Sequence, residues 1–119
     1  MVRVKRVNDK LLLLVDYHEW AGSRRTSGMP VYAILKSGDW ILLGETTKKA
    51  TSYEIPDDAL CVVRVYWSNR GIRYFYIYYP LAENIREYKI SESDLAFEDL
   101  PEEVRGHVQK FVEWWLFGE

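Results

Sequence analysis

The pattern of apolar, β-branched and turn-forming residues predicts that much of the chain forms β-strands. Residues 2–5 alternate valine with a basic residue, which is typical of a short edge strand whose cationic side chains face water. Residues 31–37 and 40–45 are rich in apolar residues and flank Gly38 and Asp39. Because a glycine at the first central position suits a type II′ turn, these two segments predict a β-hairpin.

A second hairpin is predicted further along the chain. Residues 60–67 and 72–79 are rich in β-branched and aromatic side chains, and turn-forming residues occupy 68–71 between them. Pro80 cannot donate a hydrogen bond to a sheet and therefore marks the end of the second strand. Residues 85–90 predict one more short strand.

The C-terminal segment predicts an amphipathic helix. Asp99 and Glu102 have the spacing of a capping box, and Pro101 suits the first turn, where its missing N–H costs nothing. Apolar residues recur at the spacing of one helical face: Val104, Val108, Phe111, Val112, Trp115 and Leu116. We expect this face to cover one side of the predicted sheet.

Two segments are ambiguous. The apolar positions of residues 10–20 fit one face of a helix with Asn8 or Asp9 as its cap, although the unbroken apolar run also suits a buried strand. We expect a helix there, followed by an exposed loop over residues 21–30. Residues 46–58 are polar and predict a loop or a short helix.

These elements place the chain in the α+β class, as a single domain of residues 1–119. We expect a mostly antiparallel sheet, built from the two hairpins, that packs against the C-terminal helix and an N-terminal helix.

The composition narrows the possible functions. One cysteine, Cys61, excludes an internal disulfide and a cysteine-based zinc cluster, and we expect it to be an inert core thiol. With only His18 and His107, a catalytic triad or a multi-histidine metal site is hard to assemble. We therefore expect a binding protein and no enzyme, with no cofactor and no metal site.

The sequence also bears on the cellular location of the chain. No uncharged run approaches the roughly 20 residues that a membrane crossing needs, and the first residues lack the apolar core of a signal peptide. We expect a cytoplasmic protein with no membrane contact. Only three asparagines and one glutamine are present, which favours a thermophilic source.

Charge is distributed unevenly along the chain. Residues 1–89 hold 14 Lys and Arg against 10 Asp and Glu, a net of +4, whereas residues 90–119 hold 2 against 8, a net of −6. An acidic tail is often only a solvated helix face. Binding to phosphate groups needs a local basic surface, however, and the first part of the chain can supply one.

The second hairpin carries the main functional signal. A connection of two or four residues pairs Trp67 with Ile72 and Val65 with Tyr74. One face then carries Cys61, Val63, Val65, Trp67, Ile72, Tyr74, Tyr76 and Tyr78, and we expect the C-terminal helix to cover it. The other face carries Val62, Arg64, Tyr66, Arg73, Phe75, Ile77 and Tyr79. A connection of odd length would break this sorting.

Arginines interleaved with aromatic rings favour binding of a single-stranded nucleic acid, because bases stack on the rings while cations follow the phosphates. The predicted binding residues are Arg64, Tyr66, Arg70, Arg73, Phe75 and Tyr79 of the hairpin, with Arg24, Arg25, Lys48 and Lys49 in loops that could border the sheet. The competing interpretation is that these rings are simply part of the sheet core.

The hairpin over residues 61–79, Trp40, and the helix that ends in Glu113, Trp114, Trp115, Leu116 and Phe117 together resemble one family. This family comprises the archaeal ThermoDBP-like single-stranded DNA-binding proteins, α+β domains without the usual OB-fold. The resemblance covers about residues 31–117, and it implies sequence-tolerant binding of single strands, of DNA more than of RNA, in an aromatic cleft rimmed by basic residues.

Two other interpretations remain open. The aromatic surface and the C-terminal tryptophans could form a protein–protein interaction module, including a homodimer contact through the C-terminal helix. Asp16, His18 and Glu19 could form a metal-dependent nuclease site, although a polar helix end explains this group more simply.

Overall fold

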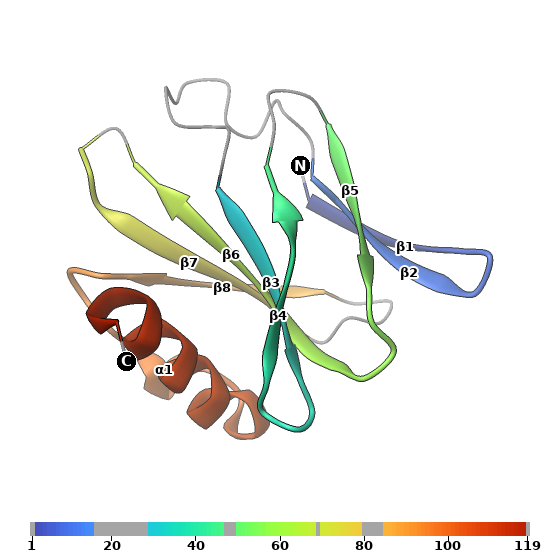
Figure 1. The fold of residues 1–119 in the computed structure, drawn as a ribbon. Helices are drawn as coiled ribbons and strands as arrows, with labels where there is room; N and C mark the ends of the chain where they lie inside the picture. Colours follow the sequence, from blue (N-terminus) through green and yellow to red (C-terminus); the bar gives the residue numbers. More distant parts are fainter. Residues whose placement is uncertain (1, 16–28, 47–49, 69, 80–84, 119) are drawn as a thin grey trace.

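The computed structural model describes residues 2–15, 29–46, 50–68, 70–79 and 85–118. Within these ranges the chain forms eight β-strands in two antiparallel sheets, and one α-helix near the C-terminus (Figure 1). The α+β class is therefore confirmed, but the fold consists mostly of sheet.

The smaller sheet has the strand order β1-β2-β5 and contains the first hairpin of the chain. Strand β1 (Val2–Val7) is an edge strand, as predicted, and pairs with β2 (Lys10–Val15). The helix predicted for residues 10–20 is wrong where the structure describes it, because residues 10–15 form β2. Asn8 and Asp9, the expected helix caps, have φ angles of 50° and 66°. Left-handed angles at two consecutive residues are typical of a tight hairpin turn.

The third strand of this sheet lies in a segment for which we expected a loop or a short helix. Strand β5 (Thr51–Ile55) pairs with β2, and its burial alternates along the chain. Tyr53 and Ile55 are buried while Ser52 and Glu54 are exposed. The polar residues of the segment thus form the outer face of a strand and do not indicate a loop.

The larger sheet has the strand order β4-β3-β6-β7-β8. Its five strands are β3 (Pro30–Leu35), β4 (Trp40–Glu45), β6 (Ala59–Trp67), β7 (Arg73–Tyr79) and β8 (Arg86–Ser91). Both predicted hairpins and the predicted strand over residues 85–90 are confirmed. Each strand pairs antiparallel with its neighbours.

The β3–β4 hairpin closes across three residues, and the predicted two-residue type II′ turn is wrong. The Leu35 N–H donates to the Asp39 carbonyl at 2.7 Å, and the Gly38 N–H donates to the Leu35 carbonyl at 2.8 Å. Gly38 has a φ of +95°, the left-handed conformation that the third residue of such a loop needs.

The β6–β7 hairpin has the same design, and this overturns the predicted register. The Ser68 N–H donates to the Ile72 carbonyl at 2.9 Å, so three residues intervene, and Gly71 has a φ of +80°. Trp67 therefore lies opposite Arg73, one position away from the predicted Ile72. A one-residue shift moves the side chains of a strand to the opposite face of the sheet. The β7 residues therefore lie on the opposite face from the one that we predicted for them.

The helix covers the sheet face that carries Val63 and Val65, as expected. Helix α1 (Glu102–Phe117) follows the 3₁₀ turn η2 (Phe97–Asp99). Its buried residues, Val104, Val108, Phe111 and Val112, share a core with Ile34, Cys61, Val63, Val65, Phe75, Ile77, Ile90 and Leu100. The predicted capping box is wrong, because Pro101 occupies the N-cap position and no side chain caps the helix.

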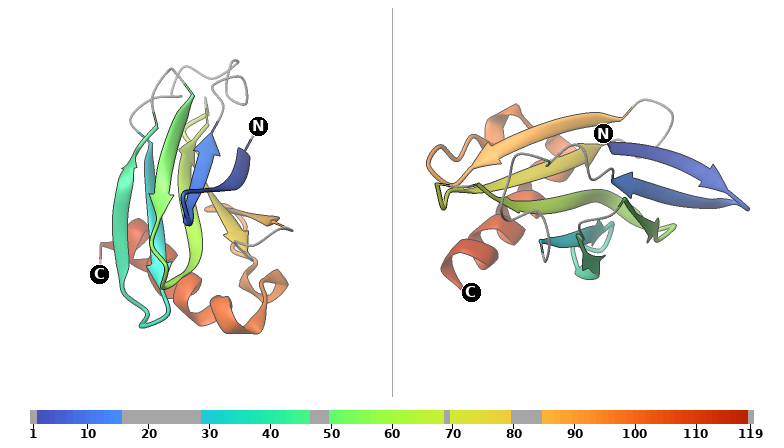
Figure 2. Two further views of the ribbon diagram at one scale, coloured as in Figure 1. Left: turned by 90° about the vertical axis from the view of Figure 1, so that its right-hand side faces the viewer. Right: turned by 90° about the horizontal axis from the view of Figure 1, so that it is seen from above.

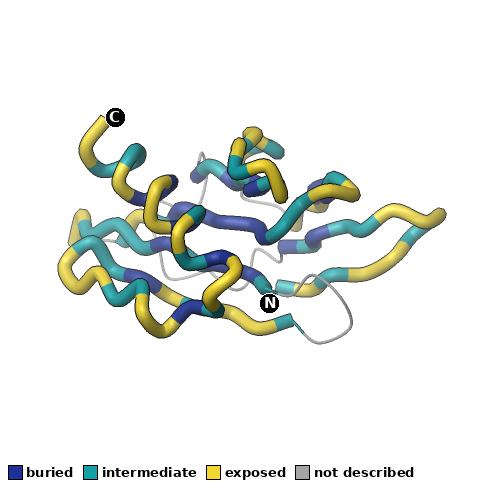
Figure 3. Tube along the Cα trace, turned by 90° about the horizontal axis from the view of Figure 1, so that it is seen from below, coloured by how far each residue is buried: buried dark blue, intermediate teal, exposed yellow. Residues whose placement is uncertain are grey.

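A second core lies between the two sheets, on the face of the larger sheet opposite α1 (Figure 2). Its buried members are Leu13, Val15, Val31, Tyr53, Ile55, Val62 and Tyr78. The larger sheet is thus covered by the helix on one side and by the smaller sheet on the other. Buried segments run through its centre, whereas exposed segments concentrate at turns and at the outer surface of the helix (Figure 3).

Two glycine substitutions test the loop geometry. Gly71 and Gly106 both have open space where a Cβ would be added, but only Gly71 has a left-handed φ. Gly71→Ala should lower the free energy of unfolding by about 1–2 kcal/mol, because L-residues are strained there. Gly106→Ala, in the exposed middle of α1, should raise it by about 0.5–1 kcal/mol. Urea unfolding of both variants measures the difference. Equal effects at the two positions would contradict the three-residue loop.

Candidate functional site

Three tyrosines lie together on the face of the larger sheet that points away from α1. Tyr66 of β6 lies opposite Tyr74 of β7, and Tyr76 lies opposite Lys89 of β8. Pairing partners share a face of the sheet, so these four side chains come from three adjacent strands onto one surface. We call this surface, formed by Tyr66, Tyr74, Tyr76 and Lys89, the tyrosine face.

The rings and the cation of the tyrosine face are in contact. The ring centroid of Tyr66 lies 6.3 Å from that of Tyr74 and 6.1 Å from that of Tyr76. The Lys89 ammonium lies 4.4 Å from the centroid of Tyr74 and 5.8 Å from that of Tyr76. These distances are within the range of cation–π attraction. The face is therefore an array of rings with a positive charge over it.

A second cation lies beneath this array. Arg64 is 1% exposed, and its guanidinium lies 4.5 Å from the ring centroid of Tyr76 and 5.8 Å from that of Tyr78. Tyr76 therefore contacts a cation from β6 and lies near the ammonium of Lys89 from β8. Lys89 adds positive charge at the exposed surface, whereas the Arg64 guanidinium is buried beneath the rings.

Two of the three tyrosines are held in place from below, and all three remain partly open to solvent. Tyr66 and Tyr76 are half-buried because they pack against the core between the two sheets. Tyr74 is also half-buried, and Lys89 is exposed. A ring that is fixed along one edge loses little conformational entropy when a ligand stacks on it.

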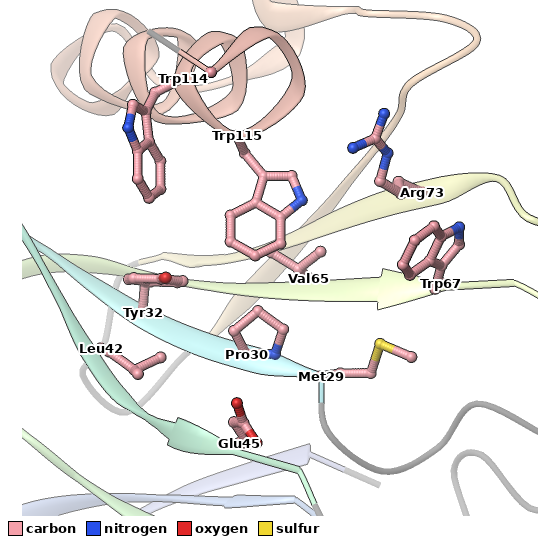
Figure 4. A pocket seen from close by; sticks show the side chains of 11 residues that line it. Met29, Pro30, Tyr32, Leu42, Glu45, Val65, Trp67, Arg73, Trp114 and Trp115 are labelled. Carbon is pink, nitrogen blue, oxygen red and sulfur yellow. The ribbon is translucent and has the colours of Figure 1, made fainter.

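The opposite side of the larger sheet contains a groove lined by aromatic rings. It has a volume of about 710 Å³ and opens beside the C-terminal end of α1 (Figure 4). We call it the aromatic groove; it is lined by Met29, Pro30, Tyr32, Leu42, Glu45, Val65, Trp67, Arg73, Trp114, Trp115 and Gly118. Its side chains come from β3, β4, β6, β7 and α1.

Two polar groups of the aromatic groove, those of Arg73 and Trp67, are tied to neighbouring residues. The Arg73 guanidinium forms an ion pair with the Glu92 carboxylate at 3.0 Å, and the Arg73 backbone N–H donates to the same carboxylate at 2.7 Å. The Trp67 indole N–H donates to the Gly71 carbonyl at 2.7 Å, which fixes the ring against the hairpin turn. The groove thus has a rigid aromatic wall and one largely neutralised cation.

The predicted binding residues of the hairpin are divided between several places. Arg64 and Tyr66 lie on the predicted side and belong to the tyrosine face or to the layer beneath it. Arg73 lies on the other side and lines the aromatic groove. Phe75 is fully buried under α1, so the core interpretation is correct for this ring.

Two further predicted residues have distinct surroundings. Tyr79 lies on the α1 side, where its hydroxyl donates to the Glu103 carboxylate. This hydrogen bond, followed by burial, raises the pKa of Tyr79. Arg70 is exposed in the turn between β6 and β7. The remaining predicted residues, Arg24, Arg25, Lys48 and Lys49, lie outside the residues that the structure describes.

Sequence reasoning missed Tyr74, Tyr76 and Lys89 as members of the candidate surface. A connection of even length, as predicted, places the first two on the helix-covered face. The signal that could have placed them is Gly71, since a glycine at the third position of a connection favours the three-residue loop.

Other candidate chemistry is limited. Burial raises the pKa of the Cys61 thiol to about 12, so this group is protonated and unreactive. Asp16, His18 and Glu19, the residues of the predicted nuclease site, lie outside the residues that the structure describes. Within the described part of the chain, no group of three or more His, Cys, Asp or Glu side chains could hold a metal ion. Among the described helices, none has the length and apolar character required to cross a membrane.

A comparison with protein-family models, curated proteins and solved structures finds no match for this chain. The resemblance to the ThermoDBP-like proteins therefore stays a prediction.

The Arg73–Glu92 pair predicts a pH dependence of stability. Burial alone would raise the pKa of the Glu92 carboxyl, but the backbone and side-chain interactions with Arg73 outweigh it and hold the pKa below its ordinary value of 4.5. Because the pKa of Glu92 is lower in the folded state, the ionised carboxylate stabilises the fold fully above its ordinary pKa. This stabilisation is lost as the pH falls through the pKa that Glu92 has in the folded state. The stability difference between wild type and Glu92→Gln should therefore shrink on acidification.

Urea unfolding between about pH 6 and about pH 3 covers this range. Glu98→Gln is the matched control, because Glu98 is exposed and its side chain makes no ion pair among the contacts described. If the stability difference between wild type and Glu92→Gln stays constant or grows on acidification, the pKa of Glu92 is not lowered by Arg73.

Proposed function

We propose that the tyrosine face binds single-stranded nucleic acid, DNA in preference to RNA, with little dependence on base sequence. The observation that carries the proposal is the contact of three half-buried tyrosine rings with one another and with the Lys89 ammonium. Every base has a flat π-surface, so stacking on such rings is tolerant of sequence.

The distribution of charge supports a path for the phosphates across this face. Lys89 is exposed on β8, Arg64 lies beneath Tyr76, and Arg70 is exposed in the adjoining hairpin turn. Glu87 shares the face on β8 but pairs with Tyr78, further from Tyr74. A strand that follows Lys89 toward the β6–β7 turn therefore moves away from this carboxylate.

The acidic helix does not oppose this path. The exposed carboxylates of α1, among them Glu102 and Glu113, belong to the layer on the other side of the larger sheet. Charges on the surface are screened beyond a Debye length of about 8–10 Å at physiological salt. The net negative charge of the chain is therefore compatible with a locally positive tyrosine face.

The binding test uses the anisotropy of a fluorescently labelled oligonucleotide. We expect a single strand to bind and a duplex of the same sequence to bind much more weakly, because paired bases cannot stack on the rings. The affinity for the single strand should fall as salt rises, since contacted phosphates release counterions. Equal binding of both forms would indicate attraction by charge alone, and absence of binding at low salt would exclude the proposal.

Two substitutions locate the site. Tyr74→Ala should weaken binding by about 1–3 kcal/mol if a base stacks there, whereas Tyr74→Phe keeps the ring and should retain most of the affinity. Lys89→Ala should weaken binding to all sequences and reduce the slope of log affinity against log salt by about one.

Lys36→Ala is the matched control for charge. Lys36 is exposed in the β3–β4 turn, and this turn lies beside the start of β6, whereas Tyr66 is near the end of that strand. The control should bind like wild type. If Lys36→Ala and Lys89→Ala lower the affinity equally, the bound strand does not follow the tyrosine face.

Intrinsic fluorescence separates the two sides of the sheet when it is measured in a Trp20→Phe background, because Trp20 lies outside the described residues. Four tryptophans, Trp40, Trp67, Trp114 and Trp115, belong to the α1 side. A strand on the tyrosine face should quench the emission of tyrosine more than that of these tryptophans. Strong quenching of tryptophan emission that disappears in a Trp67→Phe variant would instead place the bases in the aromatic groove.

A further inference from the structure

The aromatic groove has the features of a docking site. Its volume of about 710 Å³ is within the range found for binding pockets, and its wall is apolar except for Glu45 and Arg73. Two side chains at its rim remain in solvent, with Leu42 54% and Trp67 39% exposed. Exposed apolar side chains gathered around a concavity are characteristic of an interaction surface.

A projecting side chain from the same chain lies beside this groove. Phe117 is 69% exposed, the largest value among the large hydrophobic residues that the structure describes. It is the last residue of α1, one turn after Trp114, and it precedes Gly118, which lines the groove. The Gly118 N–H donates to the Trp114 carbonyl at 2.8 Å and closes the helix there. The ring therefore projects from the helix end whose Trp114, Trp115 and Gly118 line the groove, and it is not itself part of the lining.

We propose that the aromatic groove receives Phe117 of a second copy of this chain, in a dimer with two-fold symmetry. A two-fold contact requires each surface to be complementary to itself, so a projection and a cavity must lie on the same face. Phe117 and the groove both lie at the C-terminal end of α1, as this arrangement needs. In the dimer each phenyl ring leaves water for an aromatic wall, and each groove is filled.

Glu113 and Arg73 offer one pair of opposite charges near the contact, although Glu92 already neutralises much of the Arg73 charge. Glu113 is exposed on α1 one turn before Phe117, and residues four apart lie on the same side of a helix. In the proposed dimer we expect Glu113 to approach the partner's Arg73, which lines the groove. The side chain of Arg73 is 30% exposed, so it can meet a second carboxylate in addition to Glu92.

The proposed dimer is independent of the proposed nucleic-acid binding. The aromatic groove opens on the α1 side of the larger sheet, and the tyrosine face lies on the other side. Dimerisation through the groove would leave both tyrosine faces in solvent. Either proposal can therefore fail without the other.

Sedimentation equilibrium over a concentration series, from the low micromolar toward the millimolar range, tests the dimer. We expect a reversible change from the mass of one chain to that of two. Phe117→Ala should raise the dimer dissociation constant by at least about tenfold, as expected for an aromatic anchor at the centre of a contact. Leu42→Ala, on the receiving side, should raise it as well.

Ile41→Ala is the matched control. Ile41 is 40% exposed and adjacent to Leu42, but alternate residues of a strand point to opposite faces, so it lies away from the groove. This variant should dimerise like wild type, and thermal unfolding should confirm that all three variants fold. A monomer at every concentration would overturn the proposal. A dimer that Phe117→Ala and Leu42→Ala leave unchanged would overturn it too, because the contact would then lie elsewhere.

Discussion

The closure of the β6–β7 hairpin across three residues determines which side chains each face of the larger sheet presents. The hydrogen bond from the Ser68 N–H to the Ile72 carbonyl sets the register of β6 against β7. In this register Val65 lies opposite Phe75, so the two side chains share a face of the sheet. The same alignment brings Tyr66, Tyr74 and Tyr76 together on the other face. A connection longer by one residue would bury tyrosines under α1 and expose Phe75.

Two layers of different kinds cover the larger sheet, and each covers only part of a face. Helix α1 and the smaller sheet pack on opposite sides, and each encloses its own core. Beyond the edges of these layers, aromatic side chains are left half-covered. The tyrosine face and the aromatic groove both arise in this way, at the end of the sheet where β6 ends and β7 begins.

Local patterns predicted the elements of the larger sheet and the C-terminal helix well. The β-branched and aromatic content of residues 60–79 and the apolar spacing from Val104 to Leu116 depend on a core that every compact arrangement must form. Residues 10–15 were misassigned because a run of leucines has no clear period. These residues form a strand because they pair with β5, which lies about forty residues further along the chain.

The candidate sites were predicted less completely because they depend on register and on distant elements. The order of residues in β6 and β7 is visible in the sequence, but whether Tyr74 faces α1 or solvent depends on one residue of loop length. The aromatic groove draws Tyr32, Trp67 and Trp115 from three separate elements. No short segment contains enough of its wall to indicate a cavity.

The buried thiol of Cys61 makes the protein well suited to site-specific labelling. It is the sole cysteine of the chain, it is fully buried, and its pKa of about 12 keeps it protonated at neutral pH. Maleimides and methanethiosulfonates react with thiolates that they can reach. A cysteine introduced at an exposed position would consequently be modified alone, with no native cysteine to remove first. Pairs of spin labels or fluorophores could then report distances within one chain or between two.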